Sequence, residues 1–336
     1  MTTIFMTHNE AVLQNYFGKD ALAKLQQLGE VSYCRQASEP SIQEIIQQAS
    51  ACDILVSYRI PAIPAELIDA LPHLKAICRV AVDIRNIDVD HASKAGVLVT
   101  RATPGFAASV SEWIVGMMIN LGRHIPAAIT AYQADTTPTA QMGLELRGHT
   151  LGIIGFGTIA QYLAKLATAF GMKLLVSDPY ASPPEDFPGQ FTSLDQVFSK
   201  ADFVVCLAPA TPETAHLVSA DQLKQMKPTA YFINAARGEL VNEEDLYAAL
   251  EAGQLAGCAL DVGSGNDQTP PRLLAHHKKV LATPHIAGLT PQATQHQAMD
   301  VVNQIQALIN GAIPDNAVNI AHAHRAIKHF TLEIPQ

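Results

Sequence analysis

The feature that most constrains the fold is an alternation of short apolar runs with helix-like stretches along the 336 residues. A first series of runs, TIFMTH, DILVSY, LKAICRVAV and GVLVT, ends at residue 100, and helical patterns lie near residues 20–28 and 64–71. Parallel strands need long crossover connections, which are usually helices, and strand and helix patterns that alternate are typical of them. The sequence therefore predicts an α/β fold built on parallel sheets.

A second series of apolar runs begins after residue 148. It reads TLGIIGFG, KLLVSD, ADFVVCLA, AYFINAA, GCALDV and KVLATPH, with helical patterns between the runs. The stretch SVSEWIVGMMINLGRHI, between the two series, has the length and apolar content of one long helix, and a further helix is predicted over about 292–310. Because the chain exceeds twice a typical domain length, we expect two domains.

Composition excludes several classes of protein. Hydrophobic residues make up 48% of the chain and charged residues 16%, which is typical of a globular protein. The net charge of −9 disfavours a nucleic-acid partner. The five cysteines form no C-x-x-C pair, so neither a disulfide framework nor a metal site is indicated. No basic leader or long apolar run is present, and we expect a cytoplasmic protein without a membrane segment.

The stretch LGIIGFGTIAQYLA carries a phosphate-binding pattern at the junction of a predicted strand and helix. Gly155 permits a tight turn, Gly157 lets the backbone approach a pyrophosphate, and Ala160 allows close packing of the helix on the strand. The amides of Thr158 and Ile159, at the start of the helix, can receive the anion.

Glycine turns between a strand and a helix also occur without a ligand, so the pattern needs a second signal. Asp178 supplies it, because it ends the run KLLVSD about 20 residues later, where an acidic side chain binds a ribose 2′-hydroxyl. The same carboxylate repels a 2′-phosphate. Together these residues predict a dinucleotide site that prefers NAD to NADP.

Five stretches extend the pattern over nearly the whole chain: ELRGHTLGIIGFGTIAQ, PATPETAHLV, MKPTAYFINAARGELVNEEDL, GQLAGCALDV and ATPHIAGLT. In order and spacing the sequence resembles the D-isomer-specific 2-hydroxyacid dehydrogenases, a family that includes phosphoglycerate, glycerate and D-lactate dehydrogenases. The combination is far more specific than the glycine pattern alone.

The resemblance implies two doubly wound parallel-sheet domains. A flavodoxin-like substrate domain is expected to comprise residues 1–101 and 290–336, and an inserted Rossmann domain that binds NAD is expected over residues 102–289. The two predicted long helices are expected to bridge the domains, with the active site in a cleft that closes over the substrate. Family members are commonly homodimers, and HIPAAITAYQADTTPTAQMG is either an arm exchanged between subunits or a surface loop.

The resemblance also assigns roles to single residues. Arg237 would bind the substrate carboxylate and polarise the keto oxygen, and His285 would act as general acid and base. Asp261 would position the nicotinamide carboxamide. Further cofactor contacts are expected from Ala208, Pro209, Thr214, Ala235 and Ala236.

The sequence departs from the family pattern five residues after Asp261. The family carries there a glutamate that hydrogen-bonds to the catalytic histidine, whereas this chain has Asn266, followed by Asp267. An ionised partner raises the pKa of an imidazole, and an amide only orients it. Three hypotheses stay open: Asp267 replaces the glutamate, Asn266 orients His285 as a neutral partner, or the site is catalytically silent.

A second departure lies in ICRVAVDIRNIDVD, where the family usually has two glycines whose amides hold the substrate carboxylate. Ala81 and Asp83 occupy those positions, and we expect substrate contacts from Arg59, Val82 and Asp83. Asp83 would repel an anionic substrate unless it faces solvent or pairs with a neighbouring arginine. An acid that contacts the substrate would suit a hydroxyl-rich or cationic 2-keto acid.

The expected activity is the reduction of a 2-keto acid to a D-2-hydroxy acid with NADH, and the reverse oxidation. A non-catalytic protein that senses NAD, like the co-repressors of this family, is the alternative; the presence of both Arg237 and His285 favours an enzyme. A third hypothesis is oxidation of a substrate that releases no hydroxyl proton, as in the family's formate dehydrogenases.

Overall fold

The chain folds into two compact units in a computed structural model that describes residues 1–36, 38–265 and 268–333. Unit 1 comprises residues 1–105 and 290–336, and unit 2 comprises residues 106–289. Each unit contains one sheet in which all strand pairs are parallel. The predicted α/β class with two parallel sheets is confirmed.

Unit 1 has a five-stranded sheet with the order β2-β1-β3-β4-β5, which is the flavodoxin-like order. The strands are β1 (Thr3–Met6), β2 (Glu30–Tyr33), β3 (Ile54–Ser57), β4 (Ala76–Arg79) and β5 (Leu98–Arg101). The apolar pattern of the sequence does not predict β2. This edge strand has no buried residue, so its sequence, EVSY, needs no apolar run.

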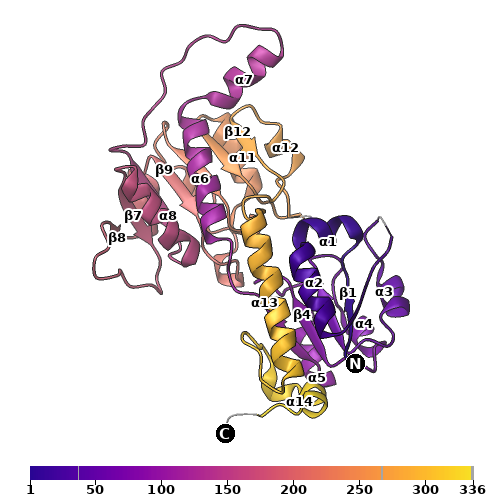
Figure 1. Cartoon of the computed structure of the whole chain (residues 1–336). Helices are drawn as coiled ribbons and strands as arrows, with labels where there is room; N and C mark the ends of the chain where they lie inside the picture. The colour runs from indigo at the N-terminus through magenta and orange to yellow at the C-terminus, as the bar shows by residue number, and fades with distance from the viewer. Residues whose placement is uncertain (37, 266–267, 334–336) are drawn as a thin grey trace. The chain divides into compact units, whose positions relative to one another are not determined.

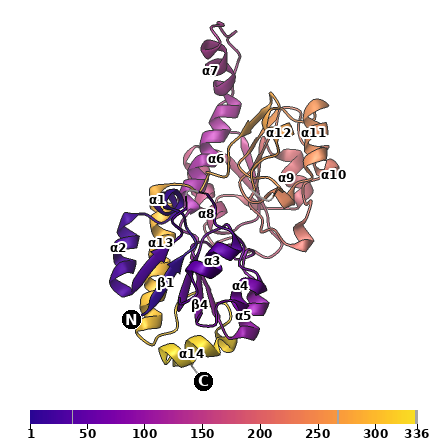
Figure 2. The same ribbon diagram turned by 90° about the vertical axis from the view of Figure 1, so that its right-hand side faces the viewer.

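Helices cover both faces of this sheet, because successive strand residues point to opposite sides. Ile4 and Met6 pack with α1 (Glu10–Tyr16), α2 (Lys19–Leu28), α13 (Pro291–Ile309) and α14 (His324–Phe330). Phe5 belongs to the opposite core, with α3 (Ile42–Gln48), α4 (Ala65–Asp69) and α5 (Val89–Ala95). In Figure 2, α2 and α13 lie on one side of β1 and β4, and α4 and α5 on the other.

Unit 2 has a seven-stranded sheet with the order β12-β11-β10-β9-β6-β7-β8. The strands are β6 (Thr150–Ile154), β7 (Lys173–Ser177), β8 (Gln190–Phe191), β9 (Phe203–Cys206), β10 (Tyr231–Asn234), β11 (Gly257–Leu260) and β12 (Val280–Ala282). Chain order reverses between β6 and β9, and in such sheets the ligand crevice lies at the carboxyl ends of the strands at this point. The sequence predicts six of these strands and misses the two-residue edge strand β8.

Helices also cover both faces of the sheet of unit 2. On one face, α6 (Ala107–Gly122) and α8 (Thr158–Ala169) lie side by side (Figure 1). The other face packs against α9 (Leu194–Lys200), α10 (Ala220–Leu223), α11 (Glu243–Glu251) and α12 (Arg272–Ala275). Among the described residues, unit 2 also has the 3-10 turns η1 (Pro212–Thr214) and η2 (Gly238–Leu240), and unit 1 has η3 (Ile320–His322). In the part of the chain that the structure describes, no helix is both long and apolar enough to cross a membrane.

The sequence predicts one long helix over SVSEWIVGMMINLGRHI, and α6 confirms it, although α6 ends at Gly122, three residues before the end of that stretch. His124 has left-handed backbone angles (φ 54°), which a continuous helix does not allow. A second helix, α7 (Ile125–Gln133), starts immediately afterwards and lies beyond the end of α6 (Figure 1). None of its residues is buried, so α7 is a separate exposed helix, and only α6 packs on the sheet.

Candidate active site

The glycine turn after β6 has the geometry of a phosphate-binding turn. Gly155 has a φ of 87°, and a Cβ there would lie 2.7 Å from the backbone nitrogen of Ala208. Gly157 is the N-cap of α8 without a side-chain cap, and a Cβ there would meet no protein atom within 4 Å. The first amides of α8 therefore have no capping side chain, and the backbone before them is open to a ligand.

Asp178 lies beside this turn although it follows the next strand, β7. Its Oδ2 accepts a hydrogen bond from the amide of Phe156 at 2.7 Å, and its Oδ1 accepts from the amides of Tyr180 and Ala181 at 2.8 and 3.1 Å. The carboxylate is thus fixed next to the glycine turn, where a ribose joined to the pyrophosphate would lie. The turn, the uncapped helix and the acid fit NAD.

The loop after β9 packs against the same turn through Ala208, the residue that excludes a side chain at Gly155. The hydroxyl of Thr214 donates to the carbonyl of Pro209 at 2.7 Å and accepts from the amide of Thr211 at 2.8 Å. These bonds close the loop on itself. In the structure the side chain of Thr214 shapes this loop, and its expected contact with the cofactor stays a prediction.

Arg237 follows β10 in a turn organised by Asn234, a buried residue that the sequence analysis missed. The Asn234 Oδ1 accepts from the amide of Ala236 at 3.1 Å, and its Nδ2 donates to the carbonyl of Arg237 at 2.9 Å. The Arg237 Nη1 in turn donates to the carbonyl of Ala236 at 2.7 Å. The available signal was a polar residue at the end of the apolar run YFIN.

The loops after β10 and β11 are locked together next to Arg237. A Cβ at Gly238 would lie 1.9 Å from the carbonyl carbon of Gly263, so only glycine fits there without displacing the backbone. Ser264 donates from its amide and its hydroxyl to the carboxylate of Glu243, at 2.9 and 2.8 Å. Close backbone packing and a carboxylate at the start of α11 therefore hold both loops.

Asp261, at the end of β11, holds the loop that carries His285. Its side chain is only 2% exposed, and burial raises its pKa while three hydrogen bonds act in the opposite direction. The Oδ1 accepts from the Thr283 hydroxyl at 2.6 Å and from the Ile286 amide at 2.8 Å, and the Oδ2 accepts from the Ala287 amide at 2.8 Å. The sequence analysis missed Thr283, whose hydroxyl completes this set.

These hydrogen bonds therefore hold the chain both before and after His285. Its amide donates to the backbone carbonyls of Asp261 and Thr283, at 2.9 and 3.0 Å. Its φ of 56° is uncommon for a residue with a side chain and is maintained by these surrounding bonds. The carboxylate of Asp261 thus orients residues 283–287, and its expected contact with the nicotinamide stays a prediction.

Asn266 and Asp267 lie outside the residues that the structure describes. The described residues before and after them are joined by hydrogen bonds. The Gly263 amide donates to the carbonyl of Gln268 at 3.1 Å, and the Gln268 amide donates to the carbonyl of Gly265 at 2.8 Å. The three hypotheses for the partner of His285 therefore remain predictions.

In unit 1, Asp83 pairs with Arg85. The Arg85 Nη2 lies 3.0 Å from the Asp83 Oδ2, and the Arg85 amide donates to the Asp83 Oδ1 at 3.0 Å. Arg79 is buried, and it ties this loop to β3 by donating to the carbonyls of Asp83 and Ser57 at 3.1 and 3.2 Å. Arg59 and Val82 are partly buried. Because Arg85 compensates its charge, Asp83 repels an anion less than its sequence position suggests.

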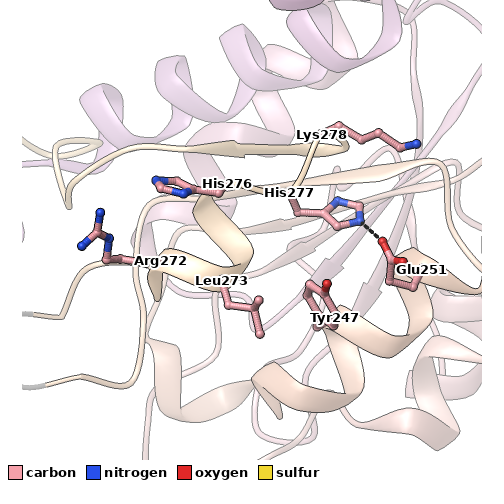
Figure 3. Close-up of a pocket in the computed structure, with 7 residues that line it drawn as sticks. All are labelled: Tyr247, Glu251, Arg272, Leu273, His276, His277 and Lys278. Carbon is pink, nitrogen blue, oxygen red and sulfur yellow. Dashed lines mark hydrogen bonds and ion pairs between the residues drawn. The ribbon is translucent and has the colours of Figure 1, made fainter.

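A hollow of about 670 Å³ lies elsewhere in unit 2, and seven residues of α11, α12 and the turn after α12 line it (Figure 3). They are Tyr247, Glu251, Arg272, Leu273, His276, His277 and Lys278. The Nε2 of His277 is paired with Glu251 at 2.9 Å, and Arg272 and Lys278 point in opposite directions (Figure 3). The charged groups do not converge, so this hollow is not part of the candidate site.

Comparison with known proteins adds sequence evidence. Residues 115–287 match the family model described as "D-isomer specific 2-hydroxyacid dehydrogenase, NAD binding domain". The chain is 36% identical over 299 residues to a D-3-phosphoglycerate dehydrogenase of Synechocystis sp., covering 88% of this chain and 53% of that protein. It is 35% identical over 265 residues to a hydroxypyruvate reductase of Thermotoga maritima, covering 78% of this chain and 86% of that protein.

A solved structure is also similar to this chain in sequence and fold. The TT0316 protein of Thermus thermophilus is 28% identical, with a TM-score of 0.84, covering 94% of this chain and all of that one. The chain spans only about half the length of the phosphoglycerate dehydrogenases that it matches. The match to the NAD-binding model lies wholly within unit 2, where the glycine turn and Asp178 are found.

Replacing Asp261 with asparagine tests whether the hydrogen bonds of its carboxylate hold the loop around His285. The amide NH₂ of asparagine cannot accept the hydrogen bond from Ala287, so a buried donor loses its partner. We expect a loss of about 1–3 kcal/mol in the free energy of unfolding, measured by urea denaturation. Thr283→Val, which removes one bond to the same carboxylate, should cost about 1 kcal/mol. An Asp261→Asn protein as stable as the wild type would contradict this account of the loop.

Proposed function

We propose that this chain, which belongs to the D-isomer-specific 2-hydroxyacid dehydrogenase family, reduces a 2-keto acid to a D-2-hydroxy acid with NADH and catalyses the reverse oxidation. The observation that carries the proposal is the edge of one sheet. In unit 2 the glycine turn, Asp178, Arg237 and His285 all follow the carboxyl ends of parallel strands. This edge is where open α/β sheets bind ligands.

The cofactor would bind along this edge through backbone atoms and the Asp178 carboxylate. That carboxylate already accepts three amide hydrogen bonds and has oxygen lone pairs left for ribose hydroxyls. A 2′-phosphate would meet its negative charge, which favours NAD over NADP. The proposed cofactor contacts are Gly155, Gly157, Thr158, Ile159, Asp178, Ala208, Pro209, Thr214, Ala235, Ala236 and Asp261.

In the proposed reaction, Arg237 binds the substrate carboxylate through its planar guanidinium and stabilises the negative charge that develops on the keto oxygen. Its hydrogen bond to the carbonyl of Ala236 fixes the side chain before substrate arrives. When bound, NADH supplies the hydride. His285 donates a proton to the keto oxygen, and the bonds around Asp261 keep the imidazole on a rigid loop.

Unit 1 supplies the proposed substrate contacts Arg59, Val82 and Asp83. Since Asp83 is paired with Arg85, a cationic substrate is no longer needed to balance its charge. We propose a 2-keto acid that carries a hydroxyl group. The relatives have names that specify phosphoglycerate, hydroxypyruvate or glyoxylate, which are all small 2-hydroxy or 2-oxo acids, and hydroxypyruvate is a 2-keto acid with a hydroxyl group. None of these names favours the alternative, a non-catalytic NAD-sensing protein.

A panel of 2-keto acids tests the proposal. The absorbance of NADH should decrease over time when at least one of the acids is added. His285→Ala should lower kcat by about 10²–10⁴-fold because it removes the proton donor. NADH binding by the variant, measured by fluorescence, should match the wild type. Binding of NADH without consumption by any acid would turn the assignment to the sensing protein.

The partner of His285 is tested by Asp267→Asn. If Asp267 replaces the family's glutamate, the loss of its charge lowers the pKa of the imidazole. His285 must be protonated to reduce the keto acid, so the alkaline limb of the kcat/KM profile for reduction moves to lower pH. Asn266→Ala is the matched control on the neighbouring residue. An unchanged profile and turnover in Asp267→Asn would eliminate the charged partner, and a larger effect of Asn266→Ala would favour the neutral one.

We also propose a cytoplasmic homodimer that assembles through the segment 124–143 of unit 2. Apolar side chains of this segment are exposed, among them Ile129 (49%), Tyr132 (67%) and Met142 (95%). Burying them in a second subunit would stabilise a dimer, because exposed apolar clusters mark contact surfaces. Light scattering after size-exclusion chromatography should give twice the chain mass, and a protein with Ile129→Asp and Tyr132→Asp together should shift towards the monomer. A wild-type protein that is a monomer in solution would contradict dimerisation through this segment.

A further inference from the structure

The hollow formed by α11, α12 and the turn after α12 has an apolar part that is open to solvent. Leu273 of α12 lines it and is 63% exposed, and Tyr247 of α11 lines it as well. An exposed leucine by itself is common, but this one lies in a concave surface of about 670 Å³, a volume in the range of ligand sites. A ligand with an apolar group would gain free energy by covering Leu273.

His277 forms a fixed wall of this hollow. Its side chain is only 5% exposed, its Nε2 lies 2.9 Å from the Oε1 of Glu251, and its Nδ1 accepts from the amide of Lys279 at 3.1 Å. Since an amide can only donate, Nδ1 carries no proton, and Nε2 donates to Glu251. The ring of Tyr247 packs edge-on against the imidazole, with 5.7 Å between the centroids. His277 therefore shapes the hollow and has no nitrogen left for a ligand.

Positive charges flank the hollow on a chain that is acidic overall. The lining residues include Arg272 and Lys278, which point in opposite directions (Figure 3). The stretch 271–279, PRLLAHHKK, contains no acid, whereas the whole chain carries a net charge of −9. Because the two cations diverge, they cannot both contact one small anion. They suit a ligand whose acidic groups are spaced apart.

Two chemical classes carry negative charges spaced in this way, nucleic acids and acidic peptides. A nucleic acid is a continuous row of phosphates, and the net charge of the chain would repel it. A short acidic peptide covers only the local patch, and recognition of acidic motifs by basic side chains is a recurring mode of peptide binding. A peptide also supplies an apolar side chain that can cover Leu273. The chemistry of the hollow therefore favours a peptide.

We propose that the hollow formed by α11, α12 and the turn after α12 is a docking site for an acidic peptide segment of a partner protein. An apolar side chain of the segment packs against Leu273 and Tyr247. Acidic side chains on either side of it pair with Arg272 and Lys278. The acid that lines the hollow, Glu251, has a side chain that is 59% exposed and weakens this binding by repulsion. Docking does not depend on the proposed reaction, because none of these residues belongs to the candidate site.

Fluorescence anisotropy of a labelled peptide tests the docking site. The probe has two leucines between two pairs of aspartates, and it should bind the full chain with a Kd below about 1 mM. Arg272→Glu and Lys278→Glu together should weaken binding by about tenfold or more, because both contacts become repulsive. The matched control, Lys165→Glu with Lys200→Glu, makes the same change in net charge on exposed residues of α8 and α9. It should change Kd by less than about threefold.

Glu251→Gln should give a gain of binding, which a misfolded variant cannot imitate. Glutamine keeps an oxygen that accepts from His277 and removes the negative charge, so the probe should bind about two- to fivefold more tightly. An unchanged or weaker affinity of this variant would overturn the proposed place of the acidic side chains. A probe with serines in place of the leucines should bind wild type about tenfold more weakly, because it has no apolar group to cover Leu273.

Three further outcomes would overturn the docking site. The first is no binding of the leucine probe at about 1 mM. The second is equal weakening by the variant of Arg272 and Lys278 and by its control, since binding would then follow only the net charge of the chain. The third is equal affinity for a single-stranded oligonucleotide, which would show general attraction of anions. None of these outcomes would affect the proposed reaction, which the panel of 2-keto acids tests separately.

Discussion

The arrangement of the candidate site depends on one property of parallel sheets: all strands end at the same edge. In unit 2 this property places the glycine turn after β6, Asp178 after β7, Arg237 after β10 and Asp261 after β11 along one line. These residues are far apart in the sequence. The sheet order gives them a common edge, and in open α/β sheets a reversal such as that between β6 and β9 marks the place where a dinucleotide binds.

A few buried polar groups hold the loops of the candidate site in place. Asn234 organises the turn that carries Arg237, and the carboxylate of Asp261 holds residues 283–287 around His285. Gly238 lets the loops after β10 and β11 touch. Burying polar groups such as Asn234 and Asp261 costs free energy, and each of them makes hydrogen bonds that also orient its neighbours. His8 in unit 1 differs from them, since its nitrogens find no partner in the described part of the protein.

Several parts of this arrangement could be predicted from the sequence for physical reasons. The glycine turn could be found because Gly155 and Gly157 serve backbone geometry that other residues do not permit. Strands buried on both faces were recognised from continuous apolar runs. The strands β2 and β8 were missed because edge strands need no such run, and Asn234 and Thr283 were missed because their importance lies in bonds that only the fold creates.

The sequence by itself determined the fold class and the dinucleotide motif, because each has a local pattern of small, apolar or charged residues. Only the tertiary structure decided that Asp83 is paired with Arg85, that α7 is exposed along its whole length, and that Asp261 holds the loop around His285. The reason is the same in each case. The partner of a side chain, unlike its type, depends on which distant segments the sheet brings together.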